Sequence, residues 1–494
     1  MPRVLMIGID SLAPTLLSEL QADLPTFSQL RRQSPPLRLT SIFPIDSIPA
    51  WATIFTGLNP AKHGLIYSFD VFEANWGAIS KIDSSVFRGR TFWDYAGQGG
   101  KKVCILFPLL AYPAWPVNGV MLSRSLTGAG DAWPRRILDE QNLSRFETLS
   151  GRHPGRRRLL EYAQRAEKIT EKEAAIASTI LSRHEWDLAF VFFGYLDIIQ
   201  HFFWRYFDPS DPTYPGPTPF QNVIREFYIL LDRIVGELVN LHPDSIVVVF
   251  SDHGHGMRPP RTVNINECLR EAGLLCSRNG VVNPAPYLLE NIKRVVLDFI
   301  HRFELDHWML EVSRRGILSS VTKSLYMSRA TIDMERTVAC LSSFAGPKSY
   351  PYGGVEIIRE NLKKRGMEYE EVRSRVIHLL SQLKEPETGR PLVEWACRRE
   401  DLYSGSYLDL YPDVLFELRE GYGVYWGIHT PLIGTAYEHN LAPGGHRKEA
   451  VFLLSNAGRP VSRYEMTLED IAPTVLDLLG LEGDWHFDGC SILI

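Results

Sequence analysis

The sequence predicts an α/β protein with a mostly parallel central sheet and a further region inserted into its core. Apolar runs rich in branched residues begin at residues 3, 101, 186, 244 and 449. Runs of this kind are typical of strands buried on both faces. Amphipathic helical stretches at 157–183 and 220–241 lie between the runs. Such alternation of strands and helices is typical of a parallel sheet covered by helices on both sides.

Each segment of the chain can be placed on this pattern in order. The first strand, RVLMIGID, ends on a glycine and an acid, and the runs KKVCILFPL, WDLAFVFFG and DSIVVVFSDHG repeat it. The pattern then loosens, with helical segments expected around 289–315 and 370–383, before the strand EAVFLLSNAG and the helix TLEDIAPTVLDLLG follow. Because the flanking pieces resemble parts of one sheet, we predict a core at 1–257 and 430–494 and an inserted cap or substrate region at 258–429.

The composition is that of an ordinary globular protein and excludes several classes. Among 494 residues, 45% are apolar and 22% charged, and the formal net charge of −5 argues against a general nucleic-acid surface. No stretch approaches the roughly 18 apolar residues of a membrane span, and the first apolar run is too short for a signal peptide. We therefore expect a cytoplasmic protein. The six cysteines form no CxxC pair, so neither a disulfide framework nor a thiolate zinc site is predicted, and the oligomeric state stays open.

Acids and histidines follow three of the expected strands. Asp10 ends the first strand, Asp197 and His201 follow the third, and Asp252 and His253 follow the fourth. Ligands of open parallel sheets gather at these carboxyl ends. Asp197 and His201 are four residues apart, which suits a shared ion on one helix face and, equally, an exposed helical pair. The Asp252–His253 pair is more specific, because unpaired charge beside so apolar a strand is costly and a cation would compensate it.

Three more residues complete the chemical inventory. His446, in APGGHR, is typical of a turn when taken alone, but with the others it gives three acids and three histidines, enough for two divalent ions in an N/O environment. Two ions about 4 Å apart clamp the attacking and leaving oxygens of a displacement at phosphorus. Ser47, in FPIDSIPAWATIFTG, is a turn residue by itself and a nucleophile if such ions are present. We interpret His255 as a loop histidine.

With these residues together, the chain resembles the alkaline phosphatase superfamily, most closely its type I phosphodiesterase/nucleotide pyrophosphatase branch. The matching motifs are GID, FPIDSIPAWATIFTGLNPAKHG, DIIQH, SDHG, GGHR and DIAPTVLDLLG, which occur in the family's order over nearly the whole chain. The resemblance implies a three-layer α/β/α sandwich with an inserted cap, and Ser47 at the position of the family's nucleophile. It also implies two ion sites, one formed by Asp197, His201 and His446 and the other by Asp10, Ser47, Asp252 and His253.

The family resemblance also implies which metals are bound, and the chain differs from related families in two motifs. It implies zinc, with manganese as the alternative because related cofactor-independent phosphoglycerate mutases use it, and it gives His63 a structural role. The P-N-H element of eukaryotic relatives is replaced by Pro49-Ala50-Trp51, so oxyanion stabilisation must come from backbone N–H groups, the metals or another side chain. Trp51 also stands where arylsulfatases require arginine, which argues against sulfatase activity.

The expected reaction is hydrolysis of a small phosphate ester, a phosphodiester with a nucleoside or other apolar arm, through a covalent phosphoryl- or nucleotidyl-serine. The alternatives are a phosphomonoesterase or phosphomutase of the same superfamily, and a catalytically inactive binding protein on this fold. Trp51, Tyr67 and Phe69 follow the nucleophile and could form an aromatic wall for the substrate. We expect at least one of these three to be a core residue instead.

Overall fold

The computed structural model describes residues 3–66, 84–143, 145–149, 153–278, 332–342 and 349–494, together with residues 295 and 344. The described residues form two compact units. One unit contains 3–66, 84–256 and 446–494, and the other contains 257–445. The cap boundaries expected from the sequence, 258–429, stay a prediction, and the helix expected at 289–315 falls almost wholly outside the described residues.

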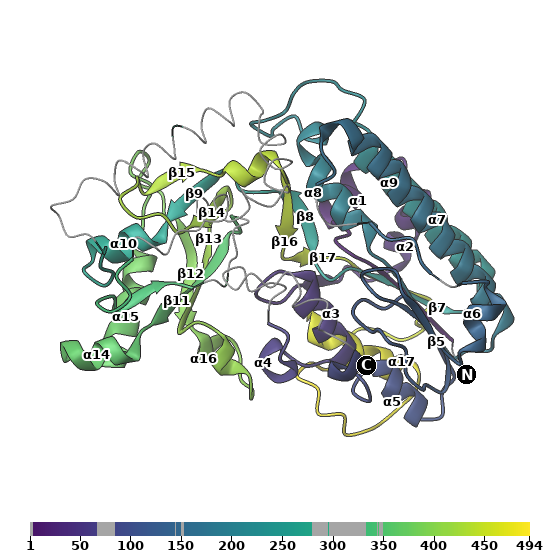
Figure 1. Cartoon of the computed structure of the whole chain (residues 1–494). Coiled ribbons are helices and arrows are strands. Elements are labelled where there is room, and N and C mark those ends of the chain that lie inside the picture. The colour runs from purple at the N-terminus through teal and green to yellow at the C-terminus, as the bar shows by residue number, and fades with distance from the viewer. Residues whose placement is uncertain are drawn as a thin grey trace. The chain divides into compact units, whose positions relative to one another are not determined.

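The first unit is built on a seven-stranded sheet of order β18-β7-β1-β6-β3-β4-β5 (Figure 1). The five central strands are parallel, whereas β18 pairs antiparallel with β7 and β5 antiparallel with β4. This confirms the predicted α/β class with a mostly parallel sheet. In chain order, the strands are β1 (Val4–Ile9), β3 (Val103–Leu106), β4 (Gly119–Arg124), β5 (Gly130–Trp133), β6 (Leu188–Phe193), β7 (Ile246–Phe250) and β18 (Phe452–Ser455).

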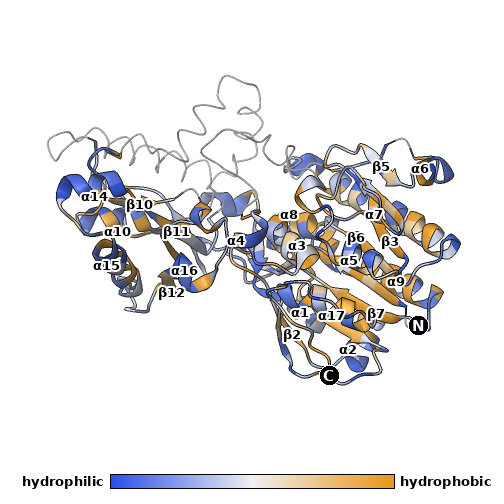
Figure 2. Ribbon diagram, turned by 90° about the horizontal axis from the view of Figure 1, so that it is seen from below, coloured by the Kyte–Doolittle hydropathy of each residue, from blue (hydrophilic) through white to orange (hydrophobic). Residues whose placement is uncertain are grey.

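Helices cover both faces of this sheet, so the first unit has three layers (Figure 1). One group comprises α1 (Pro14–Glu19), α2 (Pro25–Gln33), α7 (Leu159–Arg183), α8 (Tyr195–Phe207) and α9 (Val223–Leu241). The other comprises α3 (Ser47–Thr56), α4 (Pro60–His63), α5 (Phe92–Gln98) and α17 (Ile471–Leu478). Side chains alternate along each strand, and Met6, Phe190 and Phe250 point into the core shared with α3, α5 and α17. Figure 2 shows the strands of the sheet as strongly hydrophobic, as expected for strands buried on both faces.

Smaller elements complete the first unit. The helix α6 (Arg136–Glu140) follows β5, and a small sheet joins β2 (Arg38–Thr40), β17 (Glu449–Ala450) and β19 (Glu465–Thr467). Two strands next to the unit boundary, β8 (Gly254–Met257) and β16 (Gly444–Arg447), pair with each other. Strand β8 begins shortly after β7, just past Asp252 and His253, and β16 ends shortly before β17.

The second unit has its own sheets and apolar core. A four-stranded antiparallel sheet has the order β10 (Ala339–Leu341), β11 (Tyr352–Ile357), β13 (Val414–Leu418) and β12 (Val393–Arg398). A three-stranded sheet has the order β14 (Tyr422–Tyr425), β9 (Arg261–Asn264) and β15 (Ile433–Thr435). The helices are α10 (Ile265–Glu271), α14 (Arg359–Arg365), α15 (Tyr369–Ser381) and α16 (Arg399–Leu402). The helix predicted at 370–383 corresponds to α15. Among the described residues, no helix combines the length and the apolar character needed to cross a bilayer.

Candidate functional site: acids and imidazoles at three strand ends

The register of the large sheet brings three acids to one edge. Strand β1 lies between β6 and β7, with Ile9 opposite Phe193 and Gly8 opposite Phe250. The three strands therefore end side by side, and the Asp10 N–H continues the ladder by donating to the Phe193 carbonyl at 2.9 Å. Asp10 follows β1, Asp197 lies in the first turn of α8 after β6, and Asp252 follows β7.

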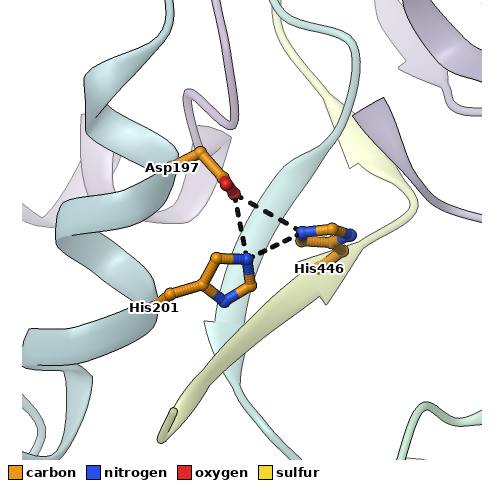
Figure 3. Close-up of side chains that lie close together, drawn as sticks. All are labelled: Asp197, His201 and His446. Carbon is orange, nitrogen blue, oxygen red and sulfur yellow. Dashed lines mark hydrogen bonds and ion pairs between the residues drawn. The ribbon is translucent and has the colours of Figure 1, made fainter. Parts of the chain in front are cut away.

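The first donor group consists of Asp197, His201 and His446 (Figure 3). Asp197 and His201 lie one turn apart on α8, and His446 comes from β16, near the other end of the chain. Asp197 Oδ1 lies 3.3 Å from His201 Nε2 and 3.4 Å from His446 Nε2, and the two imidazole nitrogens are 3.0 Å apart. One ligand atom from each residue thus lies within 4.8 Å of the other two. This triad brings together the three residues that the family resemblance assigns to one ion.

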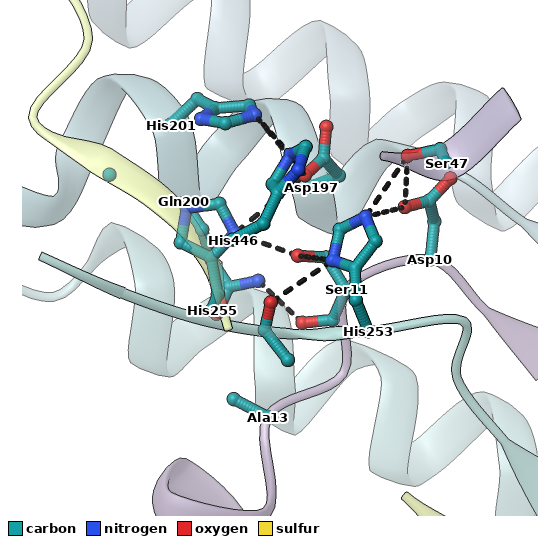
Figure 4. Close-up of polar contacts among 12 residues, drawn as sticks. Asp10, Ser11, Ala13, Ser47, Asp197, Gln200, His201, His253, His255 and His446 are labelled. Carbon is teal, nitrogen blue, oxygen red and sulfur yellow. Dashed lines mark hydrogen bonds and ion pairs between the residues drawn. The ribbon is translucent and has the colours of Figure 1, made fainter. Parts of the chain in front are cut away.

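The second donor group combines Asp10 and His253 with the same Asp197. Asp252 belongs to this neighbourhood as well, because its Oδ2 lies 3.2 Å from His253 Nε2. Figure 4 shows Asp10 and His253 directed toward Ser47, with Asp197 nearby. The sequence predicted Asp10, Asp252 and His253 here. It did not predict that Asp197 would belong to both groups.

Ser47 is the first residue of α3 and faces the second donor group. Its Oγ lies 3.2 Å from Asp10 Oδ1 and 3.1 Å from His253 Nε2 (Figure 4). The side chain of the N-cap residue Asp46 accepts the Ile48 N–H at 3.1 Å, which starts the helix at Ser47. A helix N-terminus carries partial positive charge and suits an anion. The sequence alone left Ser47 between turn residue and nucleophile, and the structure places its hydroxyl among the acids and imidazoles.

Few backbone N–H groups of the first turn of α3 are available to a phosphoryl oxygen. The Ile48 N–H is bonded to the Asp46 side chain, the Ala50 N–H donates to the Asp46 carbonyl at 3.1 Å, and Pro49 has no N–H. The amide of Ser47 itself remains as the backbone donor that this turn can offer. The first turn of α3 thus offers one backbone N–H, that of Ser47, in place of the family's asparagine.

Burial sets the electrostatics of this cluster. It raises the pKa values of Asp10 and Asp252, and the neighbouring carboxylates raise them further. Burial acts in the same direction on Asp197, but the surrounding imidazoles outweigh it, led by His201, and hold the pKa of Asp197 well below its ordinary value. Burial also lowers the pKa of His253 far below that of a free imidazole. The cluster therefore resists carrying its full negative charge unless a positive charge is added.

The imidazole tautomers fit a bound cation. His446 Nδ1 lies 2.8 Å from the Ile45 carbonyl, and His253 Nδ1 lies 3.0 Å from the Gly254 carbonyl. A carbonyl only accepts, so each Nδ1 carries a proton and, in the neutral ring, each Nε2 presents a lone pair to the acids. Asp252 Oδ2 is buried and accepts no hydrogen bond from the described residues. Lone pairs aimed at carboxylate oxygens repel one another, whereas a divalent ion between them satisfies both. The donor set thus fits the hard-to-borderline ions that the family resemblance implies.

Two residues of the site were not recognised from the sequence. His255 is a buried residue of β8 and not a loop histidine, since its Nδ1 lies 2.7 Å from Ser11 Oγ and 3.6 Å from Asp197 Oδ1. Ser11 is buried with φ of 66°, and its N–H donates to Asp252 Oδ1 at 3.1 Å. The available signal was its position in the sequence, two residues after the predicted ligand His253.

The three aromatic residues proposed for substrate binding divide into two cases. Trp51 is fully buried among Phe55, Phe190, Phe192 and Phe250, and its indole N–H donates to Asp10 Oδ2 at 3.3 Å. A ring with no exposed surface cannot form a wall for a substrate, so the suggested substrate contact is wrong for Trp51 and the core alternative holds. Tyr67 and Phe69 lie outside the described residues.

His63 is a buried structural residue, as the family resemblance implied. It ends α4, and its Nδ1 accepts the Leu65 N–H at 3.1 Å. The proton must then sit on Nε2, which lies 3.0 Å from Thr53 Oγ1 in α3. Burial, together with the nearby Arg90 charge, lowers the pKa of His63 to about 3. A neutral imidazole therefore ties α4 to the helix that carries Ser47.

Known proteins share both the sequence pattern and the architecture. The chain matches the type I phosphodiesterase / nucleotide pyrophosphatase family over residues 4–445, and no curated protein sequence matches it. Human ectonucleotide pyrophosphatase / phosphodiesterase 5 is 12% identical with a TM-score of 0.53, over 99% of this chain and 97% of that protein. Phosphonoacetate hydrolase from Sinorhizobium meliloti 1021, in complex with phosphonoformate, is 15% identical with a TM-score of 0.55, over 97% and 96%.

At these identities the structural likenesses show the fold, which is the alkaline-phosphatase-type sandwich expected from the sequence. The family match extends over nearly the whole chain and confirms the resemblance drawn from the motifs. It also confirms the prediction that the protein is an enzyme, a phosphoric ester hydrolase. The chain belongs to the type I phosphodiesterase / nucleotide pyrophosphatase family.

Proposed function

We propose that this hydrolase is a two-metal-dependent phosphodiesterase or nucleotide pyrophosphatase that acts through a covalent phosphoryl- or nucleotidyl-serine at Ser47. The observation that carries the proposal is the placement of the Ser47 hydroxyl, which lies at a helix N-terminus, 3.2 Å from Asp10 Oδ1 and 3.1 Å from His253 Nε2. A role in the turn alone does not require the hydroxyl to contact a buried acid and a buried imidazole.

Two divalent ions are the proposed cofactors, with zinc first and manganese second. Asp197, His201 and His446 would hold one ion, and Asp10, Ser47, Asp252 and His253 the other, with Asp197 close to both. When bound, such ions stabilise phosphoryl oxygens as Lewis acids and increase the acidity of a coordinated hydroxyl. The structure's buried acids supply the negative charge that such binding requires.

The chain's own residues orient the reaction. Asp46 fixes the start of α3, so Ser47 is held with its Oγ toward the donor groups and its amide at the positive end of the helix. Ser47 Oγ attacks phosphorus, the bond from phosphorus to the leaving oxygen breaks, and a phosphoserine ester forms. The hydroxyl proton passes to Asp10 Oδ1, which accepts it at 3.2 Å, and the leaving oxygen takes up a proton from water. Water then cleaves the bond between phosphorus and Oγ and restores the serine.

The family match and the donor geometry support a phosphate ester as the substrate, and we place a diester with a nucleoside or aryl arm first. Bis(p-nitrophenyl) phosphate should be hydrolysed faster than p-nitrophenyl phosphate in the presence of zinc or manganese. The reverse preference would favour the phosphomonoesterase alternative. Transfer of a phosphoryl group to a second alcohol, with little release to water, would favour a phosphomutase.

Substitution of Ser47 tests the covalent step. The Ser47→Ala variant should lose turnover while binding nearly the same amount of metal, because its acid and imidazole ligands remain. Ser47→Thr is the matched control, since it keeps a hydroxyl at the same atom and should retain part of the activity. Intact-protein mass spectrometry after acid quenching should detect the added phosphoryl or nucleotidyl group in the wild type and not in Ser47→Ala. Full activity of Ser47→Ala would refute the assignment.

A further inference from the structure

The turn that follows β1 is held in a conformation that its sequence does not favour. Ser11 has φ of 66°, in the left-handed region that residues other than glycine rarely adopt. The residue is completely buried, and its N–H donates to Asp252 Oδ1 at 3.1 Å. This conformation therefore directs the Ser11 N–H at Asp252, and Ser11 itself directly follows Asp10 in the sequence. Some neighbouring group must hold the turn in place.

Gln200 and Tyr228 hold this turn from both of its ends. Gln200 Nε2 donates to the Ser11 carbonyl at 2.9 Å, and Gln200 Oε1 accepts the Tyr228 hydroxyl proton at 3.1 Å. The Tyr228 hydroxyl oxygen in turn accepts the Ala13 N–H at 3.0 Å. Both side chains are completely buried, and Figure 4 shows the Gln200 amide next to the Ser11 turn. The chain of hydrogen bonds thus begins at the carbonyl of Ser11 and ends at the amide of Ala13.

We propose that Gln200, supported by Tyr228, is a positioning residue for the second donor group, through its members Asp10, Asp252 and His253. It acts through Ser11: with the turn fixed, the Ser11 N–H engages Asp252 Oδ1 and leaves Asp252 Oδ2 facing His253 Nε2 at 3.2 Å. Outer hydrogen bonds of this kind orient metal ligands, and their loss weakens metal binding. The inference rests on the proposed two-ion function, because it assigns Gln200 to one of the two ion sites.

The position of Gln200 allows a positioning role to be distinguished from a merely structural one. It lies on α8 directly before His201, so a general disturbance of the helix would damage the other donor group, Asp197, His201 and His446. Its hydrogen bonds run instead to the turn beside Asp10. A role in positioning therefore predicts a selective loss at the Asp10 and Asp252 group, whereas a merely structural role predicts a loss at both groups or at neither.

The test measures zinc affinity in two backgrounds, each keeping one donor group. His446→Asn preserves the Asp10, Asp252 and His253 group, and Asp252→Asn preserves the Asp197, His201 and His446 group. In the first background, Gln200→Leu should weaken zinc binding roughly 10- to 100-fold, as measured by titration against a competing chelator. In the second background, Gln200→Leu should leave the affinity unchanged. Equal weakening in both backgrounds, or no weakening in either, would overturn the proposal.

Tyr228→Phe keeps the proposal testable if Gln200→Leu does not fold, because it removes a single oxygen atom. It should weaken zinc binding in the His446→Asn background in the same direction. Tyr206→Phe is the matched control, since Tyr206 is also a buried tyrosine of this unit, with its ring packed on Phe220 at 4.9 Å. An equal effect of Tyr206→Phe would overturn the proposal.

A second readout needs no metal. In the metal-free protein, amide hydrogen exchange in the segment from Ile9 to Ala13 should be faster in Tyr228→Phe than in Tyr206→Phe. Equal exchange rates would count against the positioning role. If the wild type bound no divalent ion at all, the two-ion function and this inference would both be wrong. If the wild type bound two ions and Gln200→Leu behaved like it, only the inference about Gln200 would be wrong.

Discussion

The buried histidine behind the nucleophile helix should make stability depend on pH. His63 is only 3% exposed, and its pKa falls from 6.5 to about 3 because of burial and the Arg90 charge. Above pH 6.5 the imidazole is neutral in the folded and the unfolded chain, so its titration contributes nothing. Below pH 6.5 the unfolded chain binds a proton that the folded protein does not, and stability is lost as the pH falls toward 3.

The size of the effect follows from the pKa difference. Each pH unit below 6.5 costs about 1.4 kcal/mol, so the loss at pH 5 is about 2 kcal/mol, roughly a 30-fold change in the folding equilibrium. His63→Gln removes the titration and keeps a donor near Thr53, while the Leu65 N–H loses its acceptor. The variant should therefore be less stable than the wild type at pH 7.5, by about 1 kcal/mol, and should lose less stability on acidification.

The measurement is the urea midpoint of unfolding at several pH values from 7.5 to 5 for both proteins. The difference between wild type and His63→Gln should shrink as the pH falls, reverse sign at about pH 6, and favour the variant by about 1 kcal/mol at pH 5. His486→Gln is the control, because the His486 side chain is 84% exposed and should leave the midpoint unchanged. A difference between wild type and His63→Gln that stays constant from pH 7.5 to 5 would show that His63 is protonated normally in the folded protein and would refute the reasoning.

Three further predictions concern the site and the core. Trp51→Phe keeps an aromatic ring but removes the N–H that binds Asp10, so metal affinity should fall and thermal unfolding should shift by the equivalent of about 1–3 kcal/mol; an unchanged affinity would contradict it. Asp197→Asn should lower the content of both ions and His201→Asn that of one, as measured by elemental analysis, because only Asp197 lies in both donor groups. Ile492→Ala should lower the unfolding free energy by about 2–5 kcal/mol in denaturant titration, since Ile492 is completely buried, and a change below 1 kcal/mol would count against its core role.

The sequence allowed the large sheet and the ends of its strands to be predicted because burial on both faces leaves a strong pattern. An apolar run that stops at an acid marks the end of a parallel strand, and adjacent strand ends must meet at one edge. Asp10, Asp197 and Asp252 could therefore be grouped before any coordinates. The antiparallel direction of β18 could not be predicted, because an apolar run such as FLLS is compatible with either strand direction.

Other features of the site depend on tertiary contacts that leave little trace in sequence. Trp51 looked like a substrate residue because it follows Ser47, yet helical spacing turns its ring into the core and only its N–H toward Asp10. His255 was interpreted as a loop histidine, and only the pairing of β8 with β16 shows that it lies in a strand. Gln200 gave no signal at all, since a glutamine inside an apolar helix reveals its role only when its partners are known.

The arrangement of the three acids is itself an argument for a cation. Parallel strands β6, β1 and β7 each place one carboxylate at the same edge, so the fold that buries their apolar residues also crowds three negative groups into a poorly solvated space. Protonation could relieve the repulsion, and the raised pKa values of Asp10 and Asp252 show that tendency. Yet the imidazoles around Asp197 have Nε2 lone pairs aimed inward, fixed by Nδ1 protons bonded to carbonyls. A divalent ion accepts lone pairs from carboxylates and imidazoles alike, so bound ions would satisfy both kinds of donor at once.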